Sequence, residues 1–117
     1  MRKHLLIIDD EECILDLFSD YLNDYDCAMC TAENADKALA LIREFHFDYI
    51  ISDYTLPNMN GVDLIKIAQG IQGVSTKYIL ISGRIDVEQE AKCIDVRFVS
   101  KPLNFERILS LLDLPLK

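Results

Sequence analysis

The sequence lacks several features that would place it outside the class of small globular domains. No apolar run approaches the length of a membrane span, because Asp9 and Asp10 interrupt the run Leu5-Leu6-Ile7-Ile8 after four residues. The basic start, Arg2-Lys3-His4, precedes too few apolar residues for a signal peptide and no small-residue cleavage site follows. Repeats, low-complexity tracts and linkers are also missing. We therefore expect one cytoplasmic domain over residues 1–117.

Basic residues are in the minority. Twelve Lys and Arg residues stand against 20 Asp and Glu residues, which gives a formal net charge of −8. A protein that binds nucleic acid needs a basic face to neutralise phosphates, so we expect no direct contact with nucleic acid. The lack of a membrane-length apolar run likewise predicts no membrane partner. A cation or a basic partner surface suits this composition better.

The four cysteines do not form a convincing metal or disulfide pattern. Cys27 and Cys30 are spaced as C-x-x-C, but their surroundings are typical of a β-strand, in which positions i and i+3 point to opposite faces. Cys13 and Cys93 stand alone on expected helices. We therefore predict that all four are small apolar residues in a reducing compartment.

Five apolar stretches alternate with five stretches that carry apolar residues at helical spacing. The expected strands are Leu5–Ile8, Cys27–Thr31, Tyr49–Ser52, Tyr78–Ile81 and Val96–Val99. The expected N-caps of four of the following helices are Asp10, Asn34, Asp86 and Asn104. This alternation predicts an α/β fold in which a parallel sheet lies between two layers of helices.

Chemically active side chains follow four of the expected strands. Asp9-Asp10 follows the first strand, Asp53 the third, Ser82 the fourth and Lys101 the fifth. Because the carboxyl ends of parallel strands share one edge, where ligands bind in such folds, we expect these side chains to meet. Two carboxylates about 4 Å apart repel by roughly 4 kcal/mol at an effective dielectric near 20. A hard divalent cation would offset this repulsion, and a set of oxygen ligands without His or Cys favours Mg²⁺ over zinc.

A magnesium ion, an ammonium and a hydroxyl around one carboxylate are the parts that stabilise a phosphoryl group during transfer. Asp53 would then be the nucleophile and form an aspartyl phosphate. No glycine-rich phosphate loop is present, so the phosphate is not expected to be part of a bound nucleotide. Taken alone, Asp53 and Ser82 also fit ordinary turn residues and Lys101 fits a solvated surface lysine. Their joint placement favours the site.

These features resemble a two-component response-regulator receiver domain over essentially the whole chain. The resemblance rests on residues at successive strand ends, namely Asp9-Asp10, Asp53 with Pro57 and Gly61 behind it, Ser82, and Lys101-Pro102. It implies a flavodoxin-like three-layer α/β/α sandwich with a five-stranded parallel sheet in the order 2-1-3-4-5. The chain would be a stand-alone receiver or one excised from a longer protein.

The resemblance also implies a function. Asp53 would accept a phosphoryl group from the phosphohistidine of a sensor histidine kinase or phosphotransfer protein. Mg²⁺ would be bound by Asp10, Asp53 and the backbone carbonyl of Thr55, with Asp9 reaching it through water, and the Lys101-Pro102 bond would be cis. The protein would switch its binding surface for an unknown output partner. It would not be an enzyme beyond its own Mg²⁺-dependent phosphorylation and dephosphorylation.

Four residues match positions that transmit or tune the signal in this family. Ser82 and Phe98 match the switch pair, although Phe98 is also explained as a core residue of a short strand. Thr55 and Arg84, each two residues after an expected site residue, match positions that tune loss of the phosphoryl group. Between Ser82 and Lys101 the chain is a few residues shorter than is usual, and Lys92–Asp95 replaces a small Gly-Ala step. We expect this shortage to fall on the fourth helix or its flanking loops.

Three other functions remain to be weighed. A pseudo-receiver would keep the fold as a protein-interaction module without phosphorylation, but the set of acids, hydroxyl and lysine is complete. An aspartate-nucleophile phosphatase would carry Asp-x-Asp after the first strand, and Asp9-Asp10 has the wrong spacing. A flavodoxin-like FMN protein would need a hydroxyl- and glycine-rich loop there, and residues 9–12 would repel its phosphate.

Overall fold

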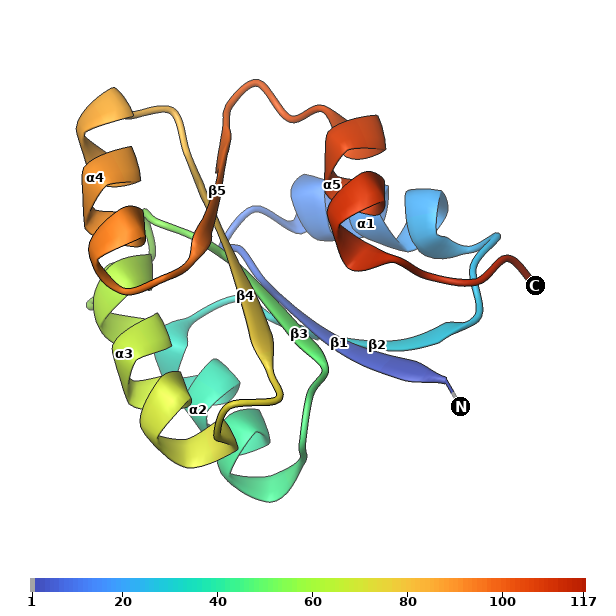
Figure 1. The fold of residues 1–117 in the computed structure, drawn as a ribbon, viewed down its shortest axis with the longest axis horizontal. Coiled ribbons are helices and arrows are strands. Elements are labelled where there is room, and N and C mark those ends of the chain that lie inside the picture. The colour runs from blue at the N-terminus through green and yellow to red at the C-terminus, as the bar shows by residue number, and fades with distance from the viewer. Residues whose placement is uncertain (1) are drawn as a thin grey trace.

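The computed structural model describes residues 2–117, which form five strands and five helices in alternation (Figure 1). The strands are β1 (Lys3–Ile8), β2 (Cys27–Ala32), β3 (Tyr49–Asp53), β4 (Lys77–Ser82) and β5 (Arg97–Ser100). The helices are α1 (Glu12–Leu22), α2 (Ala35–Glu44), α3 (Gly61–Gln72), α4 (Ile85–Cys93) and α5 (Phe105–Leu112). All neighbouring strands are parallel, in the order β2-β1-β3-β4-β5. The predicted flavodoxin-like α/β/α fold is confirmed.

The sheet separates two apolar cores. Helices α2, α3 and α4 cover one face, and α1 and α5 cover the other (Figure 1). Alternate residues of β1 enter opposite cores, with Leu6 and Ile8 on the α2–α4 side and Leu5 and Ile7 on the α1–α5 side. The three central strands are therefore nearly continuous apolar runs, as expected for strands that are covered on both faces. No helix within residues 2–117 is long and apolar enough to cross a membrane.

Two of the four predicted helix caps are confirmed. Asn34 accepts a hydrogen bond from the Lys37 amide (2.8 Å), and Asn104 accepts one from the Arg107 amide (3.2 Å). The other two predictions are wrong. α1 begins after Glu11 without a side-chain cap, because the acid that takes a local amide is Asp9 instead of Asp10. α4 begins after Arg84, and Asp86 lies inside its first turn, where its carboxylate binds the Arg84 guanidinium.

The cysteine prediction is confirmed in part. None of the four thiols forms a disulfide. Cys27 packs against the core on the α1–α5 side and Cys30 against the other, so the C-x-x-C thiols point to opposite faces as predicted. Cys13 and Cys93 are exposed, however, so they do not act as buried apolar residues. Their helices turn these positions away from the sheet.

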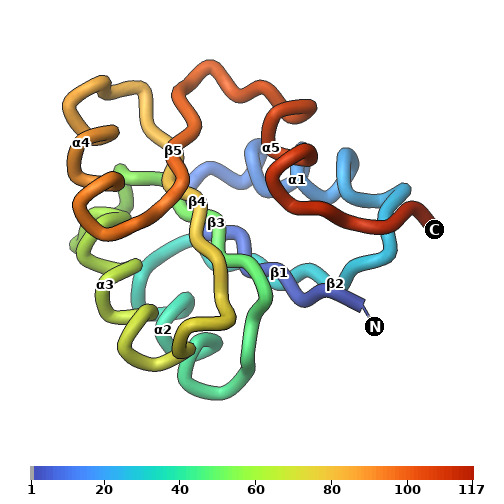
Figure 2. The backbone as a smooth tube through the Cα atoms, in the orientation of Figure 1, coloured from blue at the N-terminus to red at the C-terminus, as the bar shows by residue number. Residues whose placement is uncertain are grey.

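Polar contacts brace the edges of the layers. The Gln72 side-chain amide donates to the carbonyls of Ile42 (2.8 Å) and Phe45 (2.7 Å) and accepts from the Phe47 amide (2.8 Å), so α3 holds the end of α2. On the other face, the C-terminal segment runs beside the turn that follows α1 (Figure 2) and forms an antiparallel bridge between Leu116 and Tyr25. Each helical layer is thus tied together away from its core.

Candidate functional site

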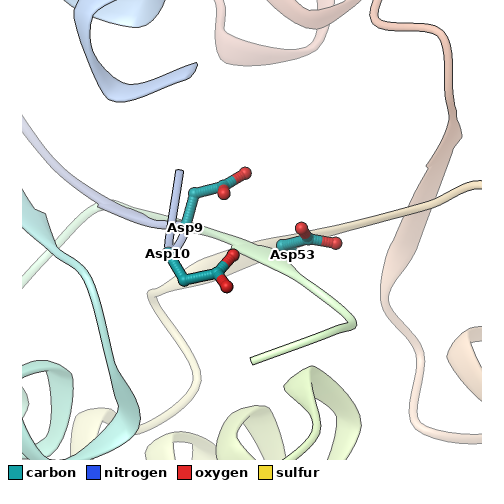
Figure 3. A group of neighbouring side chains, drawn as sticks. All are labelled: Asp9, Asp10 and Asp53. Atoms are coloured by element: carbon teal, nitrogen blue, oxygen red, sulfur yellow. The ribbon is translucent and has the colours of Figure 1, made fainter. Parts of the chain in front are cut away.

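Three carboxylates meet at the carboxyl ends of β1 and β3. Asp9 and Asp10 follow β1 and Asp53 ends β3, and Figure 3 shows the side chains of Asp9 and Asp10 extending toward the side on which Asp53 lies. One carboxylate oxygen from each residue lies within 4.8 Å of those of the other two. Asp9 and Asp53 are only 3% and 4% exposed, whereas Asp10 is exposed. The predicted acidic cluster is therefore present.

The surroundings of Asp9 oppose its ionisation. Burial raises the pKa of its carboxyl from 3.8 to about 6, and the negative charges of Asp53 and Asp10 act in the same direction. A hydrogen bond from the Glu11 amide to Asp9 Oδ1 (2.9 Å) and the charge of Lys101 oppose the shift but do not cancel it. Near neutral pH the cluster thus holds a carboxylate that is expensive to keep charged. A cation would lower that cost.

Asp53 is held by two donors. The Lys101 ammonium lies 3.0 Å from Asp53 Oδ2, and the Thr55 amide donates to Oδ1 at 3.3 Å. The neighbouring Ser52 hydroxyl donates to the Asp53 carbonyl (2.9 Å). The carboxylate therefore has a fixed direction at the end of a buried strand. It is surrounded by donors and a cation on one side and by the acids of β1 on the other.

Lys101 comes from the loop after β5. Its amide donates to the Ser82 carbonyl (3.0 Å), which places the two residues side by side, and the Lys101-Pro102 bond is cis, as the resemblance implies. Burial alone would lower the pKa of the ammonium, but the hydrogen bond and charge of Asp53 outweigh it and raise the pKa above its ordinary value. Lys101 is thus a permanent positive charge in the site.

The loop behind Asp53 requires glycine at one position. A Cβ at Gly61 would lie 2.4 Å from the Asp53 carbonyl oxygen and 2.9 Å from Leu80 Cδ1. The Gly61 amide donates to the Tyr54 carbonyl (2.7 Å), which closes the loop, and Asn58 takes a positive φ of 68° within it. The start of α3 therefore packs directly against the backbone of the candidate nucleophile.

The predicted switch and tuning residues are near the site but are engaged elsewhere. Ser82 is buried at the end of β4 and accepts from the Arg84 amide (3.0 Å). Phe98 is half-buried in β5, opposite Leu80, and packs on the core of the α2–α4 side. The guanidinium of Arg84 binds Asp86 (2.7 Å), and its central carbon lies 5.3 Å from the Tyr54 ring centroid. It therefore has partners of its own in this structure.

Two contributors were not predicted from the sequence. Tyr54 and Asp86 together hold Arg84, and neither belongs to a recognisable motif. The spacing of Arg84 and Asp86 gave no signal because residues two apart in a helix do not face one another. Their contact depends on Arg84 lying just outside α4 in extended backbone.

The donor set fits a hard divalent cation. Carboxylate oxygens from Asp9, Asp10 and Asp53 converge without a His or Cys ligand among them. Oxygen-only ligands with room for water suit Mg²⁺, and the raised pKa of Asp9 shows that the site favours added positive charge. These three residues would hold the ion. Whether the Thr55 carbonyl joins them stays a prediction.

A doubly covered parallel sheet with an acidic pocket, a buried acceptor carboxylate and a lysine at its carboxyl edge defines the receiver class of signalling domain. The model of the response regulator receiver domain family matches residues 5–113, and the chain belongs to this family. Domains of this family bind Mg²⁺ at an acidic pocket and interact with histidine kinases or phosphotransfer proteins. The resemblance noted from the sequence is confirmed.

Similar proteins include a response regulator receiver protein, a chemotaxis protein and a response regulator. The chain is 30% identical over 113 residues to a response regulator receiver protein of Anaeromyxobacter sp. (strain Fw109-5), covering 95% of this chain and 47% of that protein. Chemotaxis protein CheY4 of Vibrio cholerae shares 28% identity with a TM-score of 0.85, over 96% of this chain and 97% of that one. A response regulator of Burkholderia pseudomallei with a phosphorylated aspartic acid, a calcium ion and citrate shares 29% identity with a TM-score of 0.85, over 95% and 66%. The chain spans less than half the length of the curated relatives it matches.

Proposed function

We propose that this protein is a phosphorylation-dependent switch that accepts a phosphoryl group on Asp53 from a sensor histidine kinase or phosphotransfer protein, with Mg²⁺ as cofactor. One observation carries the proposal. The buried Asp53 carboxylate lies 3.0 Å from the Lys101 ammonium and within 4.8 Å of the oxygens of Asp9 and Asp10. A nucleophile, a counter-charge and a cation pocket are thus assembled around one carboxylate.

The chemistry follows from these contacts. An Asp53 oxygen forms a bond to the phosphorus of a phosphohistidine, the N–P bond breaks, and its electron pair returns to the imidazole. Lys101 and the Ser82 hydroxyl donate to the phosphoryl oxygens as they gain charge, and the Thr55 amide orients the carboxylate. The bound metal ion supplies further charge stabilisation. Attack by water on phosphorus then releases inorganic phosphate and restores Asp53, so the protein turns over only its own phosphoryl group.

The switch would be read through Ser82 and Phe98. Ser82 Oγ accepts from the Arg84 amide in this structure, which leaves its hydroxyl hydrogen available to an acceptor on the Asp53 side. Phe98 is only half-buried, so its ring could become further buried if a shift of Ser82 frees space in the core. Movement of this pair would change the surface around α4 and β5. An output partner protein would bind that surface.

Arg84 and Thr55 would set the lifetime of the phosphoryl group. Arg84 has to leave Asp86 and Tyr54 before it can reach a phosphoryl oxygen. In addition, Thr55 is exposed and its amide donates to the acceptor carboxylate, so we expect its side chain to influence the access of water to the phosphoryl group. The acidic composition and the absence of a membrane-length helix in residues 2–117 are compatible with a cytoplasmic signalling role without direct nucleic-acid contact.

Acetyl phosphate and Phos-tag electrophoresis test the proposal. In the presence of Mg²⁺ we expect a shifted band for the wild type, none for Asp53→Ala and an unchanged shift for Asp48→Asn. Asp48 is the matched control because it lies at the opposite end of β3, where it accepts from the His4 amide. No shift in the wild type, together with no Mg²⁺ affinity by titration, would overturn the proposal. It would favour the alternative of a pseudo-receiver that acts as a phosphorylation-independent interaction module.

A further inference from the structure

The amino end of the sheet holds a cavity far from the acidic site. β5 begins at Arg97, opposite Ile79, so the first two residues of β4, Lys77 and Tyr78, extend beyond it (Figure 1). The missing strand neighbour leaves a recess of about 480 Å³ beside β4, and an adjoining recess of about 320 Å³ reaches toward α3. Tyr78, Val74 and Asp95 line both. We name this region the basic notch and define it by Val74, Lys77, Tyr78, Lys92, Val96 and Arg97.

The charge of the notch is opposite to that of the chain. Lys77, Lys92 and Arg97 line it, and Asp95 is the single carboxylate among the lining residues. None of the ion pairs formed within residues 2–117 includes any of these three cations. In a chain with a net charge of −8, three cations without a carboxylate partner around one recess are an unusual local excess. They would attract an anion.

A buried hydroxyl at the same place has no partner. Tyr78 is 7% exposed, and within residues 2–117 its hydroxyl is the one fully buried side-chain polar atom that lacks a hydrogen bond. Leaving such a group unsatisfied is costly, so it normally finds a protein group, a water or a ligand. Neighbouring Thr76 shows the usual arrangement, because its hydroxyl donates to the Phe47 carbonyl (2.6 Å). Tyr78 lines both recesses, so a partner in the notch would have to draw this buried hydroxyl outward to form a hydrogen bond with it.

The turn after α4 brings the cations together. The amides of Ile94 and Val96 both donate to the Ala91 carbonyl (3.2 and 3.0 Å), which folds the chain back sharply so that Lys92 and Arg97 border the same recess. Asp95 adopts a positive φ of 57° to make this turn. This turn includes Lys92–Asp95, the residues that stand where the sequence resemblance expects a Gly-Ala step. The meeting of Lys92 and Arg97 therefore depends on this turn.

We propose that the basic notch binds a small organic phosphate, with the phosphate against Lys77, Lys92 and Arg97 and a less polar part against Val74, Val96 and Tyr78. An arginine with two lysines suits a phosphate dianion. The two recesses fall within the range of about 300–1,000 Å³ typical of small-molecule sites, which is far more room than a phosphate ion requires. Val96 is buried and Val74 is fully exposed at the rim, so with the Tyr78 hydroxyl they offer apolar contact and one donor to an organic group that carries an acceptor. The site does not depend on phosphorylation of Asp53.

Titration of ¹⁵N-labelled protein with phenyl phosphate tests the notch. The buffer contains EDTA and low salt, so that no metal ion recruits the probe to the acidic site. We expect saturable chemical-shift changes concentrated at residues 74–78 and 92–97, weaker affinity for inorganic phosphate and no response to phenol. The same changes in Asp53→Asn would separate this site from the proposed phosphoryl acceptor.

Variants of opposite expected sign sharpen the test. The double variant Lys92→Gln/Arg97→Gln should lower the affinity for phenyl phosphate by at least about tenfold. Tyr78→Phe should lower this affinity by about fivefold. Asp95→Asn should strengthen binding about threefold, because it removes the one carboxylate while keeping a side chain that tolerates positive φ. Lys66→Gln, an exposed lysine on α3 outside the notch, is the control and should change nothing. Shifts spread over all basic residues, or equal affinity in the double variant, would overturn the proposal.

Discussion

The two ends of the sheet carry opposite charges on the same strands. At the carboxyl end, Asp9, Asp10 and Asp53 meet Lys101, whereas at the amino end Lys77, Lys92 and Arg97 surround one recess. β4 contributes to both ends through its first and last residues, roughly 16 Å apart at about 3.3 Å per residue. This exceeds the Debye length of about 8 Å at physiological ionic strength, so the two ends respond to ions almost independently. Net charge alone therefore describes neither end.

The two ends also differ in how their buried polar groups are satisfied. Asp53 and Asp9 each have hydrogen-bond donors, and the cost that remains at Asp9 is that of keeping a buried carboxylate charged. At the amino end the strain is a missing hydrogen bond at Tyr78. A cation would relieve the first, and a hydrogen-bonding ligand would relieve the second. Stability measurements on apo protein distinguish these two causes.

The largest expected change in stability is at Gly61, where the carboxyl end of the sheet has no space for a side chain. Gly61→Ala should lower the free energy of unfolding by about 3 kcal/mol, because its Cβ would lie 2.4 Å from the Asp53 carbonyl oxygen. Urea unfolding followed by circular dichroism measures the change. Gly70→Ala is the matched control, since nothing lies within 4 Å of its Cβ position in the same helix. It should stabilise by about 0.5–1 kcal/mol. Equal effects at both positions would show that the close approach is not limiting.

Asp9→Asn should stabilise the apo protein at pH 8 by about 2 kcal/mol. The pKa of Asp9 is about 6 in the folded state against 3.8 for the ordinary carboxyl. Between these two pH values the folded protein keeps a proton on Asp9 that the unfolded chain has released. The cost of charging Asp9 is therefore absent below about pH 4 and complete above about pH 7. The difference between variant and wild type should grow across this window when unfolding is measured in EDTA. Asp16→Asn, at an exposed position of α1, should show no such trend.

At the amino end, Tyr78→Phe should raise the free energy of unfolding by about 1 kcal/mol, because it removes a buried hydroxyl that has no partner. Thermal and urea unfolding in phosphate-free buffer measure it. Tyr49→Phe is the control on the neighbouring strand and should change stability by less than about 0.5 kcal/mol. Loss of stability in Tyr78→Phe would mean that the hydroxyl is satisfied in solution by an ordered water.

The smallest expected change in stability is for glycine substitution at one backbone position at each end of the sheet. Asp95 and Asn58 both have positive φ, at 57° and 68°. Replacing either by glycine should stabilise by about 0.5 kcal/mol, since glycine adopts this conformation without a Cβ penalty while Asp and Asn pay a small one. Urea unfolding of both variants checks this. A larger gain at Asp95 would indicate that the turn after α4 is the more strained of the two.

The sequence was enough to predict the fold and the acidic site because both depend on residues at the ends of apolar runs. Asp53, Ser82 and Lys101 each end a run, and a parallel sheet brings such ends together wherever the helices begin. Helix starts were less predictable. Asp10 and Asp86 both look like caps, but other local contacts prevail, because the Glu11 amide binds Asp9 and Asp86 binds the Arg84 guanidinium.

The notch was not predictable in the same way. Its cations come from the start of β4, the end of α4 and the start of β5, and none of them belongs to a periodic pattern. Their proximity depends on β5 starting two residues late relative to β4. The missing partner of Tyr78 likewise appears only once its neighbours are placed, since the sequence indicates a buried strand residue and not the surroundings of its hydroxyl.

The Gln72 side chain has a consequence for how this protein opens. The Gln72 side-chain amide binds the carbonyls of Ile42 and Phe45 at the end of α2 and the Phe47 amide at the entry to β3. Separation of α2 from α3 would break the first two of these bonds at once. Amide protons in these two helices should therefore exchange with solvent as one cooperative unit, at similar rates. Helix α4 has no such tie to α3 beyond the bond from Gln69 to the Ile94 carbonyl. It should exchange sooner, as a separate unit.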